Sequence, residues 1–158
     1  MNYQIVLENT LKNLKEKKTL LLHACCAPCS SYVIEYLSNY FDITILFYNP
    51  NINNDIEYNK RLQELERFVK EFKTNNPVKV ISLGYNHDEY LQTVLGLEEE
   101  KEGGSRCLKC YRLRIEKTFE YAKQYNFDYV TTTLTISPLK NSQVINKIGS
   151  ELENIYHI

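Results

Sequence analysis

Short apolar runs and helical stripes alternate along the chain. Four runs have the length and the β-branched or aromatic content of buried strands, and they are Thr19–Ala24, Asp42–Tyr48, Val78–Leu83 and Tyr129–Ile136. Elsewhere apolar residues recur every three or four positions, which predicts helices over Ser30–Asn39, Glu57–Lys73, Asn86–Gly96, Cys107–Tyr125 and Asn141–Asn154. In the long fourth helix the predicted buried stripe is Leu108, Tyr111, Ile115, Phe119 and Ala122.

Alternation of strands and helices with short connections is typical of βαβ units, and these build a parallel sheet with helices on both faces. We therefore expect residues 1–158 to form a single α/β domain. Its architecture would be an open, mostly parallel sheet in a Rossmann-like or HUP-like three-layer sandwich. Ligands of such sheets bind beyond the carboxyl ends of the strands, so we look for chemistry there.

Charge and hydropathy narrow the class of protein. Lys and Arg number 19 against 20 Asp and Glu, which argues against a globally basic nucleic-acid binder. No apolar run approaches the ~20 residues that span a membrane, and Met1–Lys18 has no apolar signal core. These features predict a cytoplasmic protein. In that reducing compartment, cysteines are metal ligands or catalysts rather than disulfides.

All five cysteines fall at two predicted helix starts, Cys25, Cys26 and Cys29 after the first strand and Cys107 and Cys110 later. Helix N-termini favour thiolates, the form that binds metals. The long gap between the two groups argues against a zinc ribbon, and four thiolates suit a [4Fe–4S] cluster. Zinc and inert buried cysteines remain alternatives. The fifth thiol fits a spare nucleophile, a ligand of a second metal, or a small buried side chain.

Four segments together resemble the QueH family of epoxyqueuosine reductases: LLLHACCAPCS at Leu20–Ser30, FYNPNI at Phe47–Ile52, GGSRCLKC at Gly103–Cys110 and TTTLTISPLKN at Thr131–Asn141. The resemblance implies a cobalamin-independent oxidoreductase for the last step of queuosine biosynthesis. Such an enzyme reduces the epoxide of the modified wobble base in tRNA, with electrons from a donor that the sequence does not identify. It also implies a [4Fe–4S] cluster with an additional mononuclear iron beside it.

Carried onto this sequence, the resemblance gives each cysteine a role. Cys25, Cys26, Cys107 and Cys110 match the positions that bind the cluster, and Cys29 is the candidate ligand of the additional iron and a candidate catalytic residue. Family members continue past the last helix to a Cys-Gly-Cys segment, which this sequence lacks. The resemblance therefore implies a chain truncated at its C-terminus, where Ile155–Ile158 has the pattern of a strand beginning.

Other side chains are candidates because they are predicted at the same sheet edge. His23 precedes the first cysteines and could orient a thiolate or donate a proton, or could simply be a hydrogen-bonded packing residue. Tyr48, Asn49 and Asn51 end the second strand and could face the base, or be ordinary turn residues. The threonines of the fourth run add hydroxyls, although a Thr-rich strand needs no functional explanation.

A basic segment flanks the second cysteine pair. Within it Glu116 is the single acid, and the candidate tRNA-binding residues are Arg106, Lys109, Arg112 and Arg114, with Lys117 beyond them. Phosphates of a tRNA would dock on such a patch. The alternative is a solvated helix face.

Three rival functions stay open. Cys26-Ala27-Pro28-Cys29 after a strand is locally typical of a thiol–disulfide oxidoreductase. A tRNA-modifying ATP pyrophosphatase shares the layered α/β plan, although cysteines stand where its glycine-rich phosphate loop belongs. A metal-stabilised tRNA-binding module without turnover is the third.

Overall fold

The computed structural model describes residues 3–14, 18–72, 76, 78–100, 104–134 and 142–158, and it describes no side chains for residues 3, 4, 29 and 142. The helices are α1 (Tyr3–Asn13), α2 (Ala27–Leu37), α3 (Asp55–Glu71), α4 (His87–Thr93), α5 (Ser105–Gln124) and α6 (Ser142–Tyr156). The strands are β1 (Lys18–His23), β2 (Phe41–Phe47), β3 (Lys79–Ser82) and β4 (Tyr129–Thr132). None of the helices in these ranges is long and apolar enough to cross a membrane.

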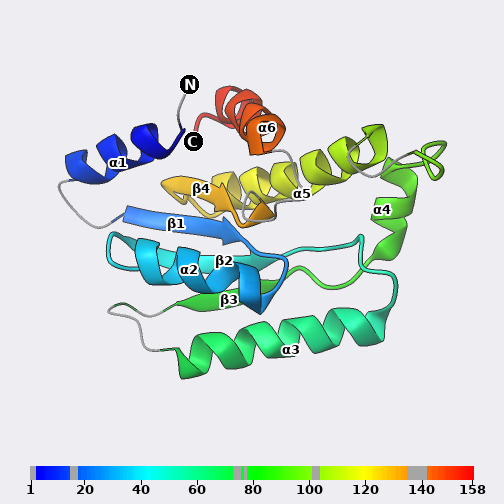
Figure 1. The fold of residues 1–158 in the computed structure, drawn as a ribbon, viewed down its shortest axis with the longest axis horizontal. Coiled ribbons are helices and arrows are strands. Elements are labelled where there is room, and N and C mark those ends of the chain that lie inside the picture. Colours follow the sequence, from blue (N-terminus) through cyan, green and yellow to red (C-terminus); the bar gives the residue numbers. More distant parts are fainter. Residues whose placement is uncertain (1–2, 15–17, 73–75, 77, 101–103, 135–141) are drawn as a thin grey trace.

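The four strands form one parallel sheet in the order β3-β2-β1-β4 (Figure 1). The chain steps from β1 to β2 to β3 in one direction, then crosses back to place β4 on the other side of β1. This reversal between β1 and β4 is a topological switch point, where α/β sheets hold their ligands. The predicted parallel α/β sheet is confirmed.

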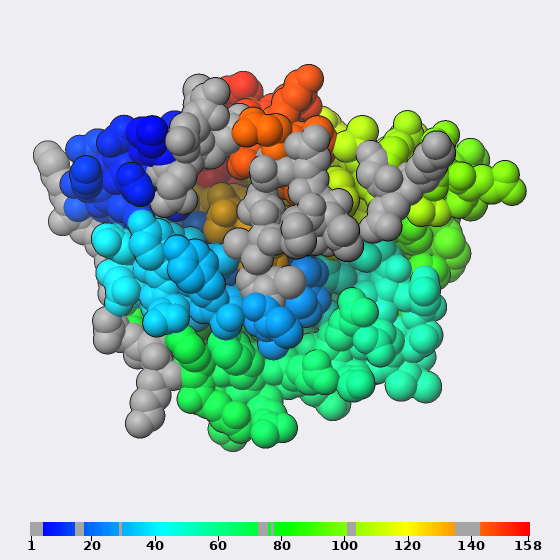
Figure 2. Space-filling model, in the orientation of Figure 1, coloured from blue at the N-terminus to red at the C-terminus, as the bar shows by residue number. Residues whose placement is uncertain are grey.

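Alternation along the strands explains why helices cover both faces. Leu20 and Leu22 of β1 point into the core beneath α1, α2 and α3, whereas Leu21 lies on the opposite face with Ala122 of α5. Successive strand side chains project to opposite faces, so a continuous apolar run serves two cores at once. Figure 2 shows α1, α2 and α3 gathered on the first face. Helix α6 packs on α5 through a third cluster.

Three features differ from the sequence prediction. Helix α1 was not predicted, and its Leu7 and Leu11, together with Leu14 just after it, pack on the first face. Helix α2 begins at Ala27, with Cys26 as its N-cap, rather than at Ser30. The last residues do not begin a strand, because α6 runs to Tyr156, whose ring stacks on Phe119 with centroids 6.0 Å apart.

The predicted buried stripe of helix α5 is confirmed at Tyr111, Ile115, Phe119 and Ala122. Leu108, which was also placed in this stripe, is 37% exposed. The buried positions include a second stripe, spaced by four residues and partly polar, made of Cys110, Arg114, Thr118 and Ala122. Residues four apart share one helix face, so the thiol of Cys110 and the guanidinium of Arg114 are buried on the same face of α5.

Candidate active site

The first cysteines lie at the switch point. Cys25 and Cys26 directly follow β1, and their Sγ atoms are 3.9 Å apart. The Sγ of Cys25 is 3.8 Å from the Oγ1 of Thr133, which follows β4 and is fully buried. The backbone N–H of Thr133 donates to the carbonyl of His23, which extends the pairing of β1 and β4 to this point. The loops after two adjacent strands therefore meet at the sulfur atoms.

His23 links the carboxyl ends of three neighbouring strands, β1, β2 and β4, next to these thiols. Its Nε2 is 3.1 Å from the carbonyl oxygen of Tyr48, and its Nδ1 is 3.0 Å from the Oγ1 of Thr132. A carbonyl only accepts, so Nε2 carries the proton and Nδ1 accepts from the Thr132 hydroxyl. That hydroxyl in turn accepts from the N–H of Leu134. Each polar atom in this series of hydrogen bonds has a defined partner, which gives His23 a positioning role. Its catalytic role stays a prediction.

Burial makes His23 a source of acid sensitivity. Complete burial, and secondarily the charge of Arg114, lower its pKa from 6.5 to about 3. Between these values the unfolded chain binds a proton that the folded chain does not. Its contribution to stability is therefore complete above pH 6.5 and is lost as the pH falls towards 3, by up to about 1.4 kcal/mol per pH unit.

We expect His23→Gln to flatten this pH dependence. The free energy of unfolding of the unsubstituted chain, measured with urea, should fall between about pH 6.5 and 5 by roughly 2 kcal/mol more than that of the variant. His157 is exposed, so His157→Gln serves as the control and should keep the full dependence. Equal slopes for His23→Gln and the unsubstituted chain would show that His23 is not held neutral.

Asn49 connects the first cysteine loop to helix α5. Its Nδ2 donates to the carbonyl of Ala24, the residue before Cys25, over 3.0 Å. Its Oδ1 accepts from Nη1 of Arg114 over 3.4 Å. Arg114 lies one helical turn after Cys110. Through this single amide the loop of Cys25 and the helix of Cys110 are held against each other.

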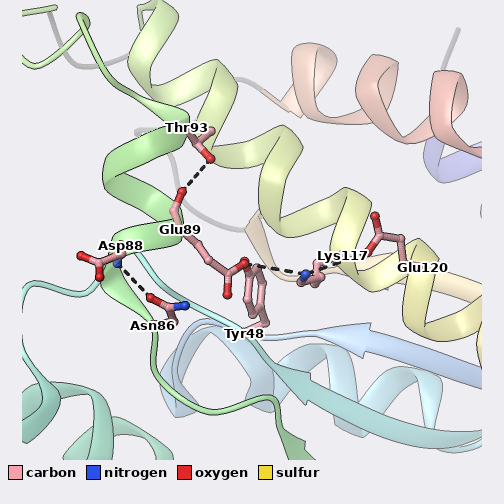
Figure 3. Close-up of polar contacts among 7 residues, drawn as sticks. All are labelled: Tyr48, Asn86, Asp88, Glu89, Thr93, Lys117 and Glu120. Carbon is pink, nitrogen blue, oxygen red and sulfur yellow. Dashed lines mark hydrogen bonds and ion pairs between the residues drawn. The ribbon is translucent and has the colours of Figure 1, made fainter.

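Tyr48 joins β2 to α4 and α5. Its hydroxyl donates to Oε2 of Glu89 over 2.6 Å, and Nζ of Lys117 lies 3.7 Å from the same oxygen and 5.6 Å from the centre of the Tyr48 ring (Figure 3). Burial, followed by the Glu89 carboxylate, raises the pKa of Tyr48 far above its usual value. The phenol of Tyr48 therefore stays protonated and donates its hydrogen bond to Glu89.

These contacts change the expected roles of the β2 end. Tyr48 and Asn49 are 2% and 1% exposed, so neither offers a surface on which a base could stack, contrary to the prediction that they face the substrate. Instead, Asn49 bonds to the loop before Cys25, and Tyr48 bonds to α4. Asn51 remains a candidate. Its Oδ1 is buried without a hydrogen-bond partner among the residues described here.

The predicted basic patch is largely neutralised by acids from other helices. Arg112 pairs with Glu151 of α6 over 2.9 Å, and Lys117 pairs with Glu89 of α4. Arg114 is buried, so it cannot contact a phosphate at the surface. Arg106, whose guanidinium donates to the carbonyl of Glu98, and the exposed Lys109 remain near the cysteines of α5. The patch is smaller than the sequence predicts.

The cysteines suit an iron–sulfur cluster by chemistry and by place. Cys25 and Cys26 lie directly before α2, and Cys107 and Cys110 are the third and sixth residues of α5. Within the described ranges no three His, Cys, Asp or Glu side chains are close enough to share one metal ion. A four-iron cluster binds each thiolate through a different iron, so its ligands stand farther apart than those of one ion. The side chain of Cys29 lies outside the description.

Thr132, Thr133 and Glu89 each hold a site residue in place. The sequence pointed to the two threonines as hydroxyls of the fourth strand without giving them a role, and it did not point to Glu89 as a partner of the site. The threonines carried a detectable signal, because a hydroxyl after β4 must lie beside the end of β1 once the sheet is parallel. The contact of Glu89 with Tyr48 had no such signal, since it depends on how α4 docks.

Comparison with known proteins identifies the family of this chain. The family described as epoxyqueuosine reductase QueH matches residues 20–158. Proteins named epoxyqueuosine reductase QueH from Streptococcus pyogenes serotype M1 and Staphylococcus epidermidis are 43% and 40% identical to this chain over 99% and 100% of its length. One from Staphylococcus aureus is 38% identical over 100%.

The fold and the site together define the class of protein: an all-parallel α/β protein with cysteine thiols at the switch point of its sheet. The chain belongs to the QueH family of epoxyqueuosine reductases. It spans 63%, 69% and 69% of the lengths of these three relatives.

Proposed function

We propose that this chain reduces the epoxide of epoxyqueuosine at the wobble position of tRNA to the alkene of queuosine. The observation that carries the proposal is the contact of the Cys25 loop with α5, through Asn49 and Arg114, one helical turn after Cys110 and at the switch point of the sheet. Family membership supports the same reaction, because its relatives are named for it. The use of an iron–sulfur cluster and the tRNA substrate are both part of what we propose.

Cys25, Cys26, Cys107 and Cys110 would hold a [4Fe–4S] cluster, and Cys29 would contribute to an additional iron. When bound, these groups supply single electrons and a Lewis acid for the epoxide oxygen. Conversion of an epoxide to an alkene and water consumes two electrons and two protons. The electrons come from an external one-electron donor, and the protons come from water.

The chain's own residues hold this site in place. His23 is neutral at physiological pH and bonded at both nitrogens, so it holds the ends of β1, β2 and β4 in register. The Thr133 hydroxyl lies beside Cys25, where it can donate to a thiolate. Hydrogen bonds to ligand sulfur are one of the means by which proteins set the potential of such clusters.

The test is conversion of the substrate itself. The chain, reconstituted with iron and sulfide without oxygen, is incubated with epoxyqueuosine-containing tRNA and a low-potential reductant, and the nucleosides are quantified by mass spectrometry. We expect queuosine to accumulate over many turnovers. A fully loaded chain that binds this tRNA and produces no queuosine with any reductant would contradict the proposal.

Salt dependence tests the docking of tRNA. Lys109 is exposed beside the cysteines of α5, so Lys109→Gln should lower the affinity and reduce the slope of log affinity against log salt by about one, the effect of one lost phosphate contact. Lys123, near the other end of α5, provides the control. Lys123→Gln should bind as the unsubstituted chain does, as measured by filter binding. Equal slopes for all three proteins would exclude this docking face.

A further inference from the structure

Arg114 is a buried cation that has no carboxylate partner among the described residues. It is 4% exposed, and within those residues its guanidinium donates to one other side chain, that of Asn49, over 3.4 Å. Its Nε is buried and has no hydrogen-bond partner in the part of the chain that is described. The guanidinium carbon stands 5.8 Å from the centre of the Tyr111 ring, whose face attracts a cation only weakly.

Other arginines of α3 and α5 are arranged differently. Arg61, Arg67 and Arg112 each contact a carboxylate within 3.1 Å, and all three lie at the surface. Arg114, with far less access to water, makes no ion pair within the described ranges. A buried charge costs several kcal/mol unless an opposite charge compensates it. The energetic balance therefore calls for an anion near Arg114.

Among the described residues, the groups near Arg114 that can carry negative charge include the Cys110 thiol of its own helix face and the phenols of Tyr90 and Tyr111. Cys110 precedes it by one turn on the same face of α5. Through Asn49 the guanidinium is also connected to Ala24, next to Cys25. The nearby Glu89 already accepts from Tyr48 and faces Lys117. Burial, and secondarily a nearby cysteine, raise the pKa values of Tyr90 and Tyr111 despite the opposing charge of Arg114, so these phenols stay neutral and do not compensate it.

We propose that Arg114 is the buried counter-cation of the cysteine site and a positioning residue that raises the reduction potential of the cluster bound there. This inference rests on the proposed function. Four thiolates and an iron–sulfur core bear net negative charge, and reduction adds to it. A fixed positive charge in a poorly solvated position therefore favours the reduced state. Because Arg114 is also bonded to Asn49, the same side chain orients the two cysteine loops.

The test compares reduction potentials of three variants after reconstitution without oxygen, in titrations with dithionite followed by electron paramagnetic resonance. Arg114→Met removes the charge and keeps much of the volume. Arg114→Lys keeps the charge. Lys123→Met removes a charge from the exposed end of the same helix and is the control.

We expect Arg114→Met to lower the ratio of reduced to oxidised cluster at least tenfold at a fixed potential, which corresponds to about 59 mV for a one-electron couple. Arg114→Lys should restore most of this ratio, and Lys123→Met should not change it. The metal-free proteins give a second readout. There Arg114→Met should unfold at the same or a higher urea concentration than the unsubstituted chain, because it removes an uncompensated charge.

Three results would overturn the inference. An intact cluster with an unchanged potential in Arg114→Met would leave the proposed function standing and remove this role of Arg114. A potential lowered equally in Arg114→Met and in Arg114→Lys would show that the charge of this side chain does not set the potential. An unsubstituted chain that takes up no cluster would refute the proposed function, and the role of Arg114 with it.

Discussion

Replacement of Cys110 by alanine should abolish cluster binding and reduce the rate of epoxide reduction by more than about a hundredfold, since even outer-shell substitutions at metal sites cost 10- to 100-fold. Cys110 is buried at the start of α5, on the face that also carries Arg114. Its loss leaves three of the four proposed cluster ligands. The measurements are iron and sulfide per chain and the yield of queuosine in tRNA.

The control for Cys110→Ala lies between the two thiols of α5. Leu108 is 37% exposed, so Leu108→Ala changes the same two helical turns without removing a ligand or opening the core. We expect Leu108→Ala to keep its iron and its activity. Full iron content and full activity in Cys110→Ala would show that α5 does not hold the cluster.

Asn49→Ala should destabilise the folded chain by roughly 2–3 kcal/mol, because it leaves the buried carbonyl of Ala24 without its donor and takes from Arg114 its one bonded side chain. The same substitution should loosen the Cys25 loop relative to α5, so reconstituted protein should lose its iron faster to a chelator. Urea unfolding of the metal-free protein measures the first effect, and loss of absorbance measures the second.

A second asparagine on the chain provides the matched control. The amide of Asn39 also donates to a backbone carbonyl, that of Glu35, but from an exposed position at the end of α2. Asn39→Ala should cost less than about 0.5 kcal/mol, the usual range for surface substitutions. If Asn49→Ala costs no more than Asn39→Ala, then the amide of Asn49 does not hold the two loops together.

The sheet and the position of the site were predictable because they depend on local patterns. Apolar runs such as Asp42–Tyr48, separated by helical stripes, permit few arrangements once connections are short, and parallel pairing follows. Cysteines that directly follow a strand must then lie at its carboxyl end. The N-cap at Asn86 was also readable from sequence, and its side chain accepts from the N–H of Asp88 as a cap should.

The remaining features depend on which helix docks against which. Counting charges within Arg106–Lys117 found one acid, but the partners of Arg112 and Lys117 come from α6 and α4. The burial of Arg114 could not be read from its residue type, since arginine is normally exposed. Helix α1 was not predicted, although Leu7, Leu11 and Leu14 have helical spacing. The polar residues between them were used only as an argument against a signal sequence, and the spacing of the leucines was not considered.

The most direct test of the central claim is the count of iron and acid-labile sulfide per chain after anaerobic reconstitution, taken together with the absorbance spectrum. The account predicts about four sulfides and four to five irons, with a broad visible band that disappears on reduction. A folded chain that stays colourless and binds zinc or no metal, with all its cysteines reduced, would contradict the claim that the two cysteine loops jointly hold an iron–sulfur centre.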